Sequence, residues 1–538
     1  MILKMLVFNV VKSLLVISLV VLFAFNCHEK KQTGKKQVKS SINPRPNIIF
    51  LLTDDQRDNT FSITGHPVIK TPNIDGLISQ GVRFSNTYIA EPICSPSRVS
   101  LFTGVHERVH GVGFTSSYEL TKEQWEQTYP AMLRDAGYYT GFIGKFGVEY
   151  YTFKGKASEK FDYWAAHDGW TRFFPKDFNI GSCMPYHDAK QDIITYIMGE
   201  KVENFLDSLP ENKPFCLSVS FSVPHATQVT SMYTECDDYR AMLFPANRNL
   251  RLKEYPIYDI LYRHSDIQIP KDCTTDPYRF IPKSILDQSG RKKTYEFDYN
   301  KKSCYEHHIR YYQVITGMDK IVGDILSGLE KNGLSENTII IFASDHGLLM
   351  GEYGMGGKAL LYDLASKIPC FVYDPSMPNN LRGRTIDNLV SSLDITKTIL
   401  DYAGVDALPH MEGESLLPLI RNNKVAWRDE IFLESLYTGR SNPFSEGVRK
   451  GHWKYIRMYK GGDRAHYSEK DLKFDGVKPD FEQLFNLKDD PTEHENILNN
   501  FEGTRLLEEL REKCANYSGK LNKQRETYKN QVRVKSRR

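Results

Sequence analysis

The sequence has few of the features that mark several common classes of protein. Its 70 Lys and Arg residues nearly balance 67 Asp and Glu residues, so the net charge of +3 gives no argument for binding nucleic acid or a membrane surface. Nine cysteines occur without a Cys-x-x-Cys pair or Cys/His zinc spacing, which argues against the common zinc sites. No internal repeat is visible. A chain of 538 residues that is 40% hydrophobic is long enough for a large core, and more than one domain is typical of this length.

The most continuous apolar run lies near the N-terminus. Residues 13–25 carry no charge and follow a start with two lysines. The run is shorter than the roughly 20 residues of a transmembrane helix and fits the core of a secretory signal. Cys27 follows at once, as in a bacterial lipoprotein cleavage box, although Asn26 is not the usual small residue. We expect a lipoprotein-type signal peptide over residues 1–26, a lipid anchor on Cys27, a polar linker over 27–45, and export to the periplasm or cell surface. Plain secretion, with Cys27 in the discarded peptide, is the alternative.

From residue 46 the pattern predicts an α/β fold. Apolar runs of strand length alternate with helical patterns, which favours a mainly parallel central sheet with helices on both faces. The predicted strands are 47–52, 214–222, 338–344 and 368–374, and the predicted helices are 73–80, 124–136, 188–209, 307–332 and 394–403. After about residue 430 the pattern changes to a hairpin (446–459) and a polar terminal helix (501–528). We therefore predict a main domain over 46–430. A small C-terminal α+β subdomain with an antiparallel sheet and a basic tail follows over 431–538.

Acidic residues follow two of these strands. Asp54 and Asp55 come directly after the first, and Asp345 and His346 follow the strand 338–344. Ligands of such folds bind at the carboxyl ends of the strands. Adjacent carboxylates repel each other unless a cation or several donors neutralise them, and hard divalent ions take oxygen ligands. These residues predict a metal site; for Asp54 and Asp55 alone, a turn or helix cap is the alternative.

Cys94 lies just before a predicted helix. Ser95 is a good N-cap and Pro96 a good first helical residue, and Arg98 is one turn further on. The free N–H groups of a helix N-terminus favour anions and depress the pKa of a thiol. The stretch therefore suits a tetrahedral oxyanion.

The residues 94–98, Cys-Ser-Pro-Ser-Arg, resemble the Cys-x-Pro-Ser-Arg signature of the type I sulfatases, of the alkaline-phosphatase-like superfamily. The resemblance extends over about residues 46–420 through "NIIFLLTDD", "PICSPSRVSLFTG", "GYYTGFIGK", "FSVPH", "NTIIIFASDHG" and "GKALLYD". It implies that Cys94 is oxidised to formylglycine by a maturating enzyme. It implies a Ca²⁺ site made by Asp54, Asp55, Asp345, His346 and the modified Cys94.

The resemblance also implies roles for the basic residues. Arg98 would hold the formylglycine, and Lys145, His225 and Lys358 would bind sulfate and the leaving group. The aldehyde would hydrate to a gem-diol that attacks sulfur with help from Asp345. Without the family context, Lys145, His225 and Lys358 are equally read as a solvated strand end, a loop histidine and a helix-start lysine.

Two positions depart from the family pattern. Many relatives have Gly-Lys-Trp-His where this chain has residues 144–147, Gly-Lys-Phe-Gly, so Gly147 replaces a histidine that contacts the formylglycine. His346 replaces the more usual asparagine after the metal-binding aspartate. A histidine is an unusual ligand for Ca²⁺.

The sequence predicts an exported sulfuric ester hydrolase that acts on a sulfated polysaccharide or its oligosaccharides, for example algal ulvan or carrageenan, or a glycosaminoglycan. A phosphonate or phosphodiester hydrolase of the same superfamily and a non-catalytic glycan-binding lipoprotein are the alternatives. Five arginines of the polar region 226–305 either bind anionic sugars or lie on the surface: Arg240, Arg248, Arg251, Arg263 and Arg279. His106 and His110 have the i, i+4 spacing of a metal pair, but without a third ligand nearby they are predicted to be structural or surface residues.

Overall fold

The computed structural model describes residues 45–114, 118–148, 157–232, 250–421, 424–460, 477–528 and 533–534. The predicted signal peptide, Cys27, all of the linker but Arg45, and Arg240 and Arg248 lie outside the described residues. Residues 44–538 form one compact unit. None of the described helices combines the length and the apolar character that a bilayer crossing requires.

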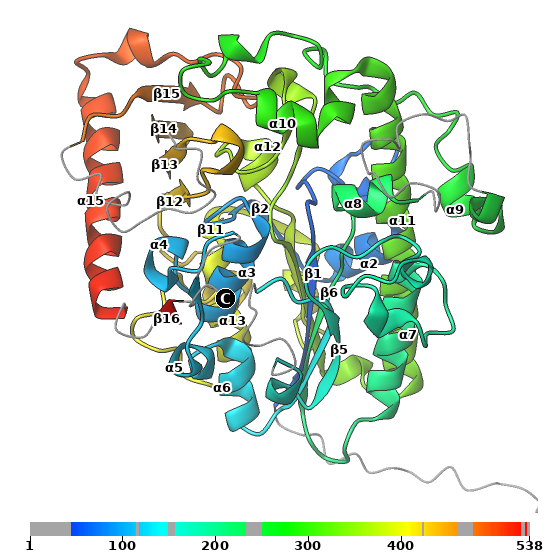
Figure 1. Cartoon of the computed structure of the whole chain (residues 1–538). Coiled ribbons are helices and arrows are strands. Elements are labelled where there is room, and N and C mark those ends of the chain that lie inside the picture. The colour runs from blue at the N-terminus through cyan, green and yellow to red at the C-terminus, as the bar shows by residue number, and fades with distance from the viewer. Residues whose placement is uncertain are drawn as a thin grey trace, which may run out of the picture. The chain divides into compact units, whose positions relative to one another are not determined.

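An eight-stranded sheet lies at the centre of this unit (Figure 1). Only β10 runs antiparallel to its two neighbours; the other paired strands of this sheet are parallel. The prediction of a mainly parallel sheet is therefore confirmed. The strand order is β11 (Arg384–Ser391), β2 (Val82–Tyr88), β10 (Cys370–Tyr373), β7 (Thr338–Ser344), β1 (Asn47–Thr53), β6 (Phe215–Ser220), β4 (Tyr139–Lys145) and β5 (Tyr163–His167).

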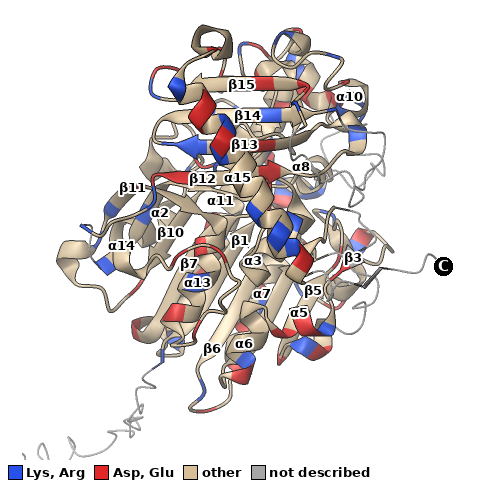
Figure 2. Ribbon diagram, turned by 90° about the vertical axis from the view of Figure 1, so that its left-hand side faces the viewer, with Lys and Arg blue, Asp and Glu red and all other residues tan. Residues whose placement is uncertain are grey.

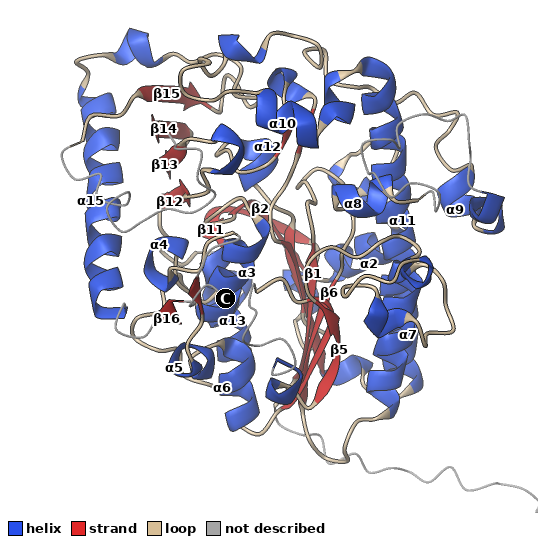
Figure 3. Cartoon of the chain, in the orientation of Figure 1, coloured by secondary structure: helices blue, strands red, loops and turns tan. Residues whose placement is uncertain are grey.

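Helices cover both faces of the large sheet, as Figure 3 shows with the sheet seen nearly edge-on. Successive side chains of a strand point to opposite faces, so β1 supplies both cores. Ile49 and Leu51 belong to one core, and Ile48 and Phe50 belong to the other. The first core is closed by α2 (Pro72–Gln80), α7 (Ile194–Asp207) and α11 (Lys301–Lys331), and the second by α3 (Cys94–Thr103), α6 (Tyr129–Asp135) and α13 (Ser392–Tyr402).

A second sheet of four antiparallel strands follows in the C-terminal part, as predicted. Its strands are β12 (Glu430–Ser435), β13 (Phe444–Lys450), β14 (Trp453–Tyr459) and β15 (Phe481–Asn486). The long helix α15 (Arg505–Tyr528) packs Leu507 and Leu510 against Val448 and Tyr455 of this sheet. Figure 2 shows charged segments along these strands, whereas β1, β6 and β7 are free of charge. The domain boundary between residues 430 and 431 stays a prediction.

Shorter elements connect these layers. They are β3 (Tyr118–Glu119), α4 (Glu107–His110), α5 (Lys122–Glu126), α8 (Ala226–Thr230), α9 (Pro256–Asp259), α10 (Ser289–Thr294), β8 (Leu349–Met350), β9 (Gly356–Gly357), α12 (Asp363–Ser366), α14 (Leu417–Arg421) and β16 (Arg533–Val534). The described part of the polar region 226–305 contains several short helices separated by turns and loops.

Two local predictions are wrong. The helix predicted over 124–136 is divided into α5 and α6, because Pro130 lacks an N–H donor and is tolerated only in the first turn of a helix, where α6 places it. Ser95 is not an N-cap: α3 begins at Cys94, and its N-cap is Ile93, which makes no side-chain capping bond. The helix start is therefore available to the groups that face Cys94.

Candidate functional site

The register of the large sheet brings the predicted site residues together. Thr53 of β1 pairs with Ser344 of β7, so Asp54 and Asp345 leave neighbouring strands at the same level. Ser220 of β6 pairs with Leu52 on one side and with Gly144 of β4 on the other, which places Lys145 and the segment leading to His225 at the same edge. Parallel strands therefore gather these side chains at the carboxyl edge of the sheet.

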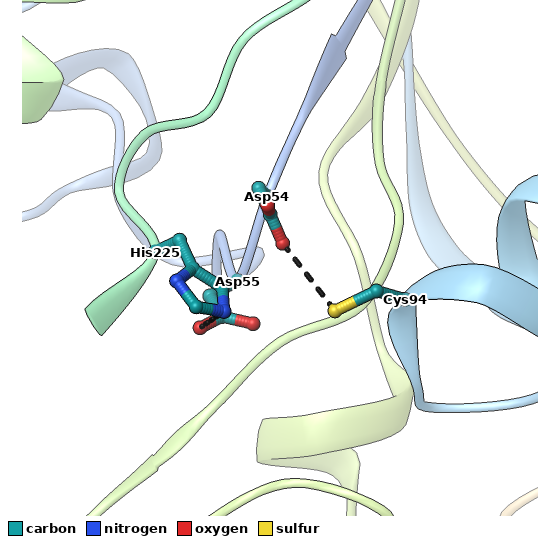
Figure 4. Close-up of side chains that lie close together, drawn as sticks. All are labelled: Asp54, Asp55, Cys94 and His225. Atoms are coloured by element: carbon teal, nitrogen blue, oxygen red, sulfur yellow. Dashed lines mark hydrogen bonds and ion pairs between the residues drawn. The ribbon is translucent and has the colours of Figure 1, made fainter. Parts of the chain in front are cut away.

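Cys94 lies in the middle of this group, fully buried at the first residue of α3. Figure 4 shows its side chain pointing toward Asp54, with Sγ 3.7 Å from Oδ1. Its Sγ also lies 2.9 Å from Lys358 Nζ and 3.2 Å from His346 Nε2. Burial alone would raise the pKa of the thiol, but Lys145 and Lys358 outweigh burial and hold it well below its usual range.

Each of the three acids faces a basic side chain. Lys145 Nζ lies 2.5 Å from Asp54, and Lys358 Nζ lies 2.6 Å from Asp55. Asp345 accepts from Arg98 Nε at 2.9 Å. Burial opposes ionisation of Asp54, but Lys145 and other nearby basic groups keep its pKa well below the ordinary value.

Asp345 and the neighbouring His346 both have raised pKa values, unlike Asp54. Burial and the charge of Asp54 raise the pKa of Asp345 to about 6. Against burial, Asp345 raises the pKa of His346 to about 9. Asp55 has φ +69°, a left-handed backbone conformation in which a non-glycine residue is strained; such strain is frequent at functional sites.

His225 approaches from the segment after β6, as Figure 4 shows. Its Nε2 lies 3.8 Å from Asp55 Oδ2, and its Nδ1 accepts from the backbone N–H of Thr227. That bond leaves Nε2 directed toward the acids. His225 and Lys358 are 9% and 7% exposed, and they are the most exposed of the predicted residues. The structure thus brings together all nine residues named from the sequence, which we call the Cys94 cluster: Asp54, Asp55, Cys94, Arg98, Lys145, His225, Asp345, His346 and Lys358.

The glycine at position 147 is accounted for by Arg98. Gly147 has φ +63°, and a Cβ atom there would lie 2.8 Å from Cδ of Arg98. The Arg98 side chain lies against Gly147, and its guanidinium donates to the Lys145 carbonyl at 2.9 Å and to Ser220 Oγ at 2.5 Å. A histidine at position 147 would therefore collide with the arginine that bonds Asp345.

The ligand atoms of the cluster fit a hard metal ion. Two overlapping groups bring their ligand atoms within 4.8 Å of one another: Asp54, Asp55, Cys94 and His225, and Asp54, Cys94, Asp345 and His346. Together they contain all five predicted ligands and add His225. Asp55 Oδ2 is buried and accepts no hydrogen bond from any described residue, which leaves it available to a cation.

A cavity of about 550 Å³ opens over the cluster, within the usual range for small-molecule sites. Cys94, His225 and Lys358 line it together with residues that sequence reasoning missed. These include the arginines Arg172, Arg291 and Arg440 and the aromatic residues Phe114, Trp170, Tyr295 and Tyr437. They come from loops and short helices without a motif. The one available signal was the arginine- and aromatic-rich composition of these segments.

The three described arginines among those proposed from the sequence, Arg251, Arg263 and Arg279, lie elsewhere. Arg251 pairs with Asp177 and Asp192, and Arg263 pairs with Glu306. Neither they nor Arg279 lines this cavity. Of the two histidines that we predicted to be structural, His106 pairs with Glu412 at 2.6 Å and His110 bonds Ser100 at 3.0 Å.

The cysteines among the described residues are free thiols. Cys216 and Cys370 are buried in β6 and β10. Cys273 and Cys304 are free, and Cys236 lies outside the described residues.

Comparison with known proteins places these observations in a family. The sulfatase family model matches residues 46–405. A second model, the C-terminal region of N-sulphoglucosamine sulphohydrolase, matches residues 351–520.

Individual relatives cover most of the chain. An N-acetylglucosamine-6-O-sulfatase of Bacteroides thetaiotaomicron is 26% identical over 507 residues, covering 87% of this chain and 85% of the relative. An ulvan-active sulfatase of Formosa agariphila is 25% identical over 503 residues, covering 87% and 84%. A structure solved in complex with its substrate D-glucosamine-2-N,6-O-disulfate shares the fold, with a TM-score of 0.67 and 23% identity over 89% of this chain and 98% of the other.

Proposed function

The chain belongs to the sulfatase family of the alkaline-phosphatase-like superfamily and is a sulfuric ester hydrolase, and from this premise we propose that it removes sulfate from a sulfated carbohydrate at the Cys94 cluster. The observation that carries the proposal is the convergence of three acids and several basic side chains on one buried cysteine beneath a cavity. Two of its relatives are named for sulfated carbohydrates, an N-acetylglucosamine-6-O-sulfate and ulvan.

We propose that a maturating enzyme converts Cys94 to formylglycine. The hydrated aldehyde supplies an oxygen nucleophile for sulfur, which divides one difficult displacement into two easier steps. The contacts of Cys94 Sγ with Lys358 and His346 place basic groups where the reacting oxygen would stand. Asp345, with its raised pKa, is positioned beside them to accept a proton.

The basic residues stabilise charge on the sulfate. Lys145 and Lys358 are buried, so their attraction to anionic oxygens is stronger than it would be in water. Arg98 fixes the positions of Asp345 and of the Lys145 backbone rather than facing the cavity. His225 and Lys358 are the basic residues of the Cys94 cluster that line the cavity, and we assign them the proton that the leaving alcohol takes up.

Asp54, Asp55, Asp345 and His346, with the modified residue 94, would hold one calcium ion. The ion neutralises sulfate charge when it is bound. Carboxylate oxygens suit calcium, whereas the imidazole of His346 is the ligand that fits it least. Chelation followed by addition of Ca²⁺, Mg²⁺ or Mn²⁺ tests the assignment. We expect Ca²⁺ to restore activity best, and restoration by Mn²⁺ alone would contradict it.

We further propose that the protein is exported and anchored in a bacterial membrane through Cys27. The support is the apolar run over residues 13–25 with a cysteine directly after it. Metabolic labelling with a radioactive fatty acid tests the anchor, with Cys27→Ser as the control. Equal labelling of both proteins, or none of either, would exclude the anchor on Cys27.

Purified protein with conversion at position 94 confirmed by mass spectrometry tests the proposed activity. The panel contains an aryl sulfate, an aryl phosphodiester, 6-sulfated N-acetylglucosamine, and ulvan and carrageenan oligosaccharides. We expect sulfate release from at least one sulfated sugar and a higher kcat/KM on the aryl sulfate than on the phosphodiester. A preference for the phosphodiester would favour the phosphodiesterase alternative. Turnover of none of these substrates by fully converted protein would favour a binding protein.

A further inference from the structure

We propose that the cavity over Cys94 recognises a second anionic group, a sulfate or a carboxylate, beside the sulfate that is hydrolysed, and that Arg172 is the specificity-determining residue. This inference rests on the proposed function. It follows from the charges that line the cavity beyond the Cys94 cluster.

The cavity has an excess of positive charge that the catalytic roles do not use. Its described lining contains Arg172, Arg291, Arg440, His225 and Lys358 but no aspartate or glutamate. The proposed mechanism already assigns His225 and Lys358 to the sulfate group that is hydrolysed. Arg172 and Arg291 therefore line the same space, and no carboxylate of the described lining pairs with either of them.

Arg172 has a hydrogen-bond donor that an anionic ligand could pair with. Its Nε atom is buried and has no hydrogen-bond partner among the described residues. Its guanidinium lies over the ring of Phe178, with Cζ 5.5 Å from the ring centroid, which fixes the group without using its donors. Arg251, by contrast, is bonded to Asp177 and paired with Asp192. A planar guanidinium whose Nε–H has no partner among the described residues matches a sulfate or carboxylate.

Arg291 supports the same conclusion from the wall of the cavity. It is 1% exposed, and its guanidinium bonds only neutral oxygens: the Lys358 and Gly356 carbonyls and Asn442 Oδ1. Its Nε has no hydrogen-bond partner among the described residues. Asp298 interacts with Arg291 electrostatically, but the hydrogen bonds of the Arg291 guanidinium go to neutral oxygens, so an anion in the cavity would lower the cost of burying this cation.

The neighbouring aromatic residue indicates that the second anion belongs to a sugar. Trp170, two residues before Arg172, lines the cavity and is 49% exposed, which is unusual for a tryptophan. Exposed aromatic faces in a cavity provide a stacking surface for an apolar ring face. Trp170 and Arg172 thus offer one surface for a pyranose ring and one for its charge.

Kinetics of Arg172→Met and of the matched control Arg251→Met test the proposal. The substrates are an aryl sulfate, glucosamine 6-sulfate, glucosamine 2-N,6-O-disulfate, and a disaccharide of uronic acid and 6-sulfated glucosamine. We expect wild type to prefer the disulfate or the uronic acid disaccharide over the monosulfate, and which of the two it prefers identifies sulfate or carboxylate. Arg172→Met should lower kcat/KM on that substrate about tenfold to a hundredfold, mainly through KM, and change the aryl sulfate less than about twofold. Arg251→Met should resemble wild type.

Binding separates failure of this inference from failure of the proposed function. Calorimetry with Cys94→Ala protein compares glucosamine 2-N,6-O-disulfate, the uronic acid disaccharide and glucosamine 6-sulfate, with and without Arg172→Met. Tighter binding of a doubly charged ligand that depends on Arg172 supports the inference even if no sulfate ester is turned over. Equal affinity for all three ligands, or equal loss for all three in Arg172→Met, overturns it.

Discussion

The Cys94 cluster and a second buried group of charges use the same kinds of side chain in opposite ways. The second group consists of Arg108 of α4, Glu434 of β12, Glu446 of β13 and Arg457 of β14, and we call it the Arg108 cluster. Arg108 bonds Glu434 at 2.8 Å and Glu446 at 2.5 Å, and Glu446 also accepts from Arg457 at 2.7 Å. The side chains of Arg108, Glu434 and Glu446 are completely buried.

The two clusters differ in the groups that pair with their buried charges. In the Arg108 cluster, protein groups from α4 and the second sheet satisfy one another, so the cluster ties these elements together. In the Cys94 cluster, Asp55 Oδ2 accepts no hydrogen bond from the described part of the chain, and Lys358 and His225 face a cavity. Buried charge that awaits a ligand indicates function, and buried charge that is paired internally indicates a structural role.

Among changes at residues other than Cys94, the largest expected effect on activity separates two buried lysines. Lys358→Met should lower kcat by roughly 10²- to 10³-fold, because Lys358 contacts both Cys94 and Asp55. Lys454 is buried as deeply but pairs with Asp363 and Glu493 away from the cavity. Lys454→Met should therefore reduce stability and leave kcat nearly unchanged. Initial rates and urea unfolding of both variants test this. Equal loss of activity would show that the contacts of Lys358 with Cys94 and Asp55 do not distinguish it from a buried lysine with a structural role.

Arg108→Met should be the most destabilising single change in the second cluster. It leaves Glu434 and Glu446 buried without a partner, and we expect the free energy of unfolding to fall by about 3–5 kcal/mol. Arg511 also binds several carboxylates but is partly exposed, so Arg511→Met should cost less than about 1 kcal/mol. Urea unfolding measures both. A small effect of Arg108→Met would show that its charges are compensated elsewhere.

The substitution Gly147→Ala tests whether the position of the Arg98 side chain matters for activity. The left-handed backbone costs an alanine about 1–2 kcal/mol, and its Cβ would press on the Arg98 side chain. Gly404 has a similar φ of +67° but open space around it, so Gly404→Ala should show only the backbone cost. We expect kcat to fall about tenfold to a hundredfold in Gly147→Ala alone. Equal activity of the two variants would show that Arg98 is not displaced.

The last effect concerns pH. Burial, with the nearby charge of Glu434, raises the pKa of Glu91 to about 8. The stability that depends on protonated Glu91 is complete below about pH 4.5 and is lost as the pH rises through 8, at up to about 1.4 kcal/mol per pH unit. Glu91→Gln should flatten this slope in urea unfolding between pH 5 and 8.

Some slope should remain in Glu91→Gln. Against burial, Glu412 raises the pKa of His106 to about 9, so stability from this pair is lost between about pH 6.5 and 9. An unchanged slope between pH 5 and 6.5 would show that Glu91 is not the titrating group.

The sequence predicted the cluster better than its surroundings, for a physical reason. Asp54, Asp345 and Lys145 follow or end parallel strands, and strand ends can be read from apolar runs. Arg172 and Arg440 lie in loops, where neither periodicity nor a motif indicates direction. The start of α3 was misplaced because Ser95 is a favourable N-cap residue, yet the backbone becomes helical already at Cys94. The role of Gly147 needed the path of the Arg98 side chain, which only the three-dimensional structure gives.

Sulfate release by wild-type protein and by Cys94→Ala protein tests the central claim most directly. Both should fold with the same urea midpoint, since alanine is accommodated at the first position of α3. The wild-type protein, with position 94 converted, should release sulfate from a sulfate ester. The variant should be slower by a factor on the order of 10⁴ or more. Full activity of folded Cys94→Ala protein would contradict the assignment of this cluster as the active site.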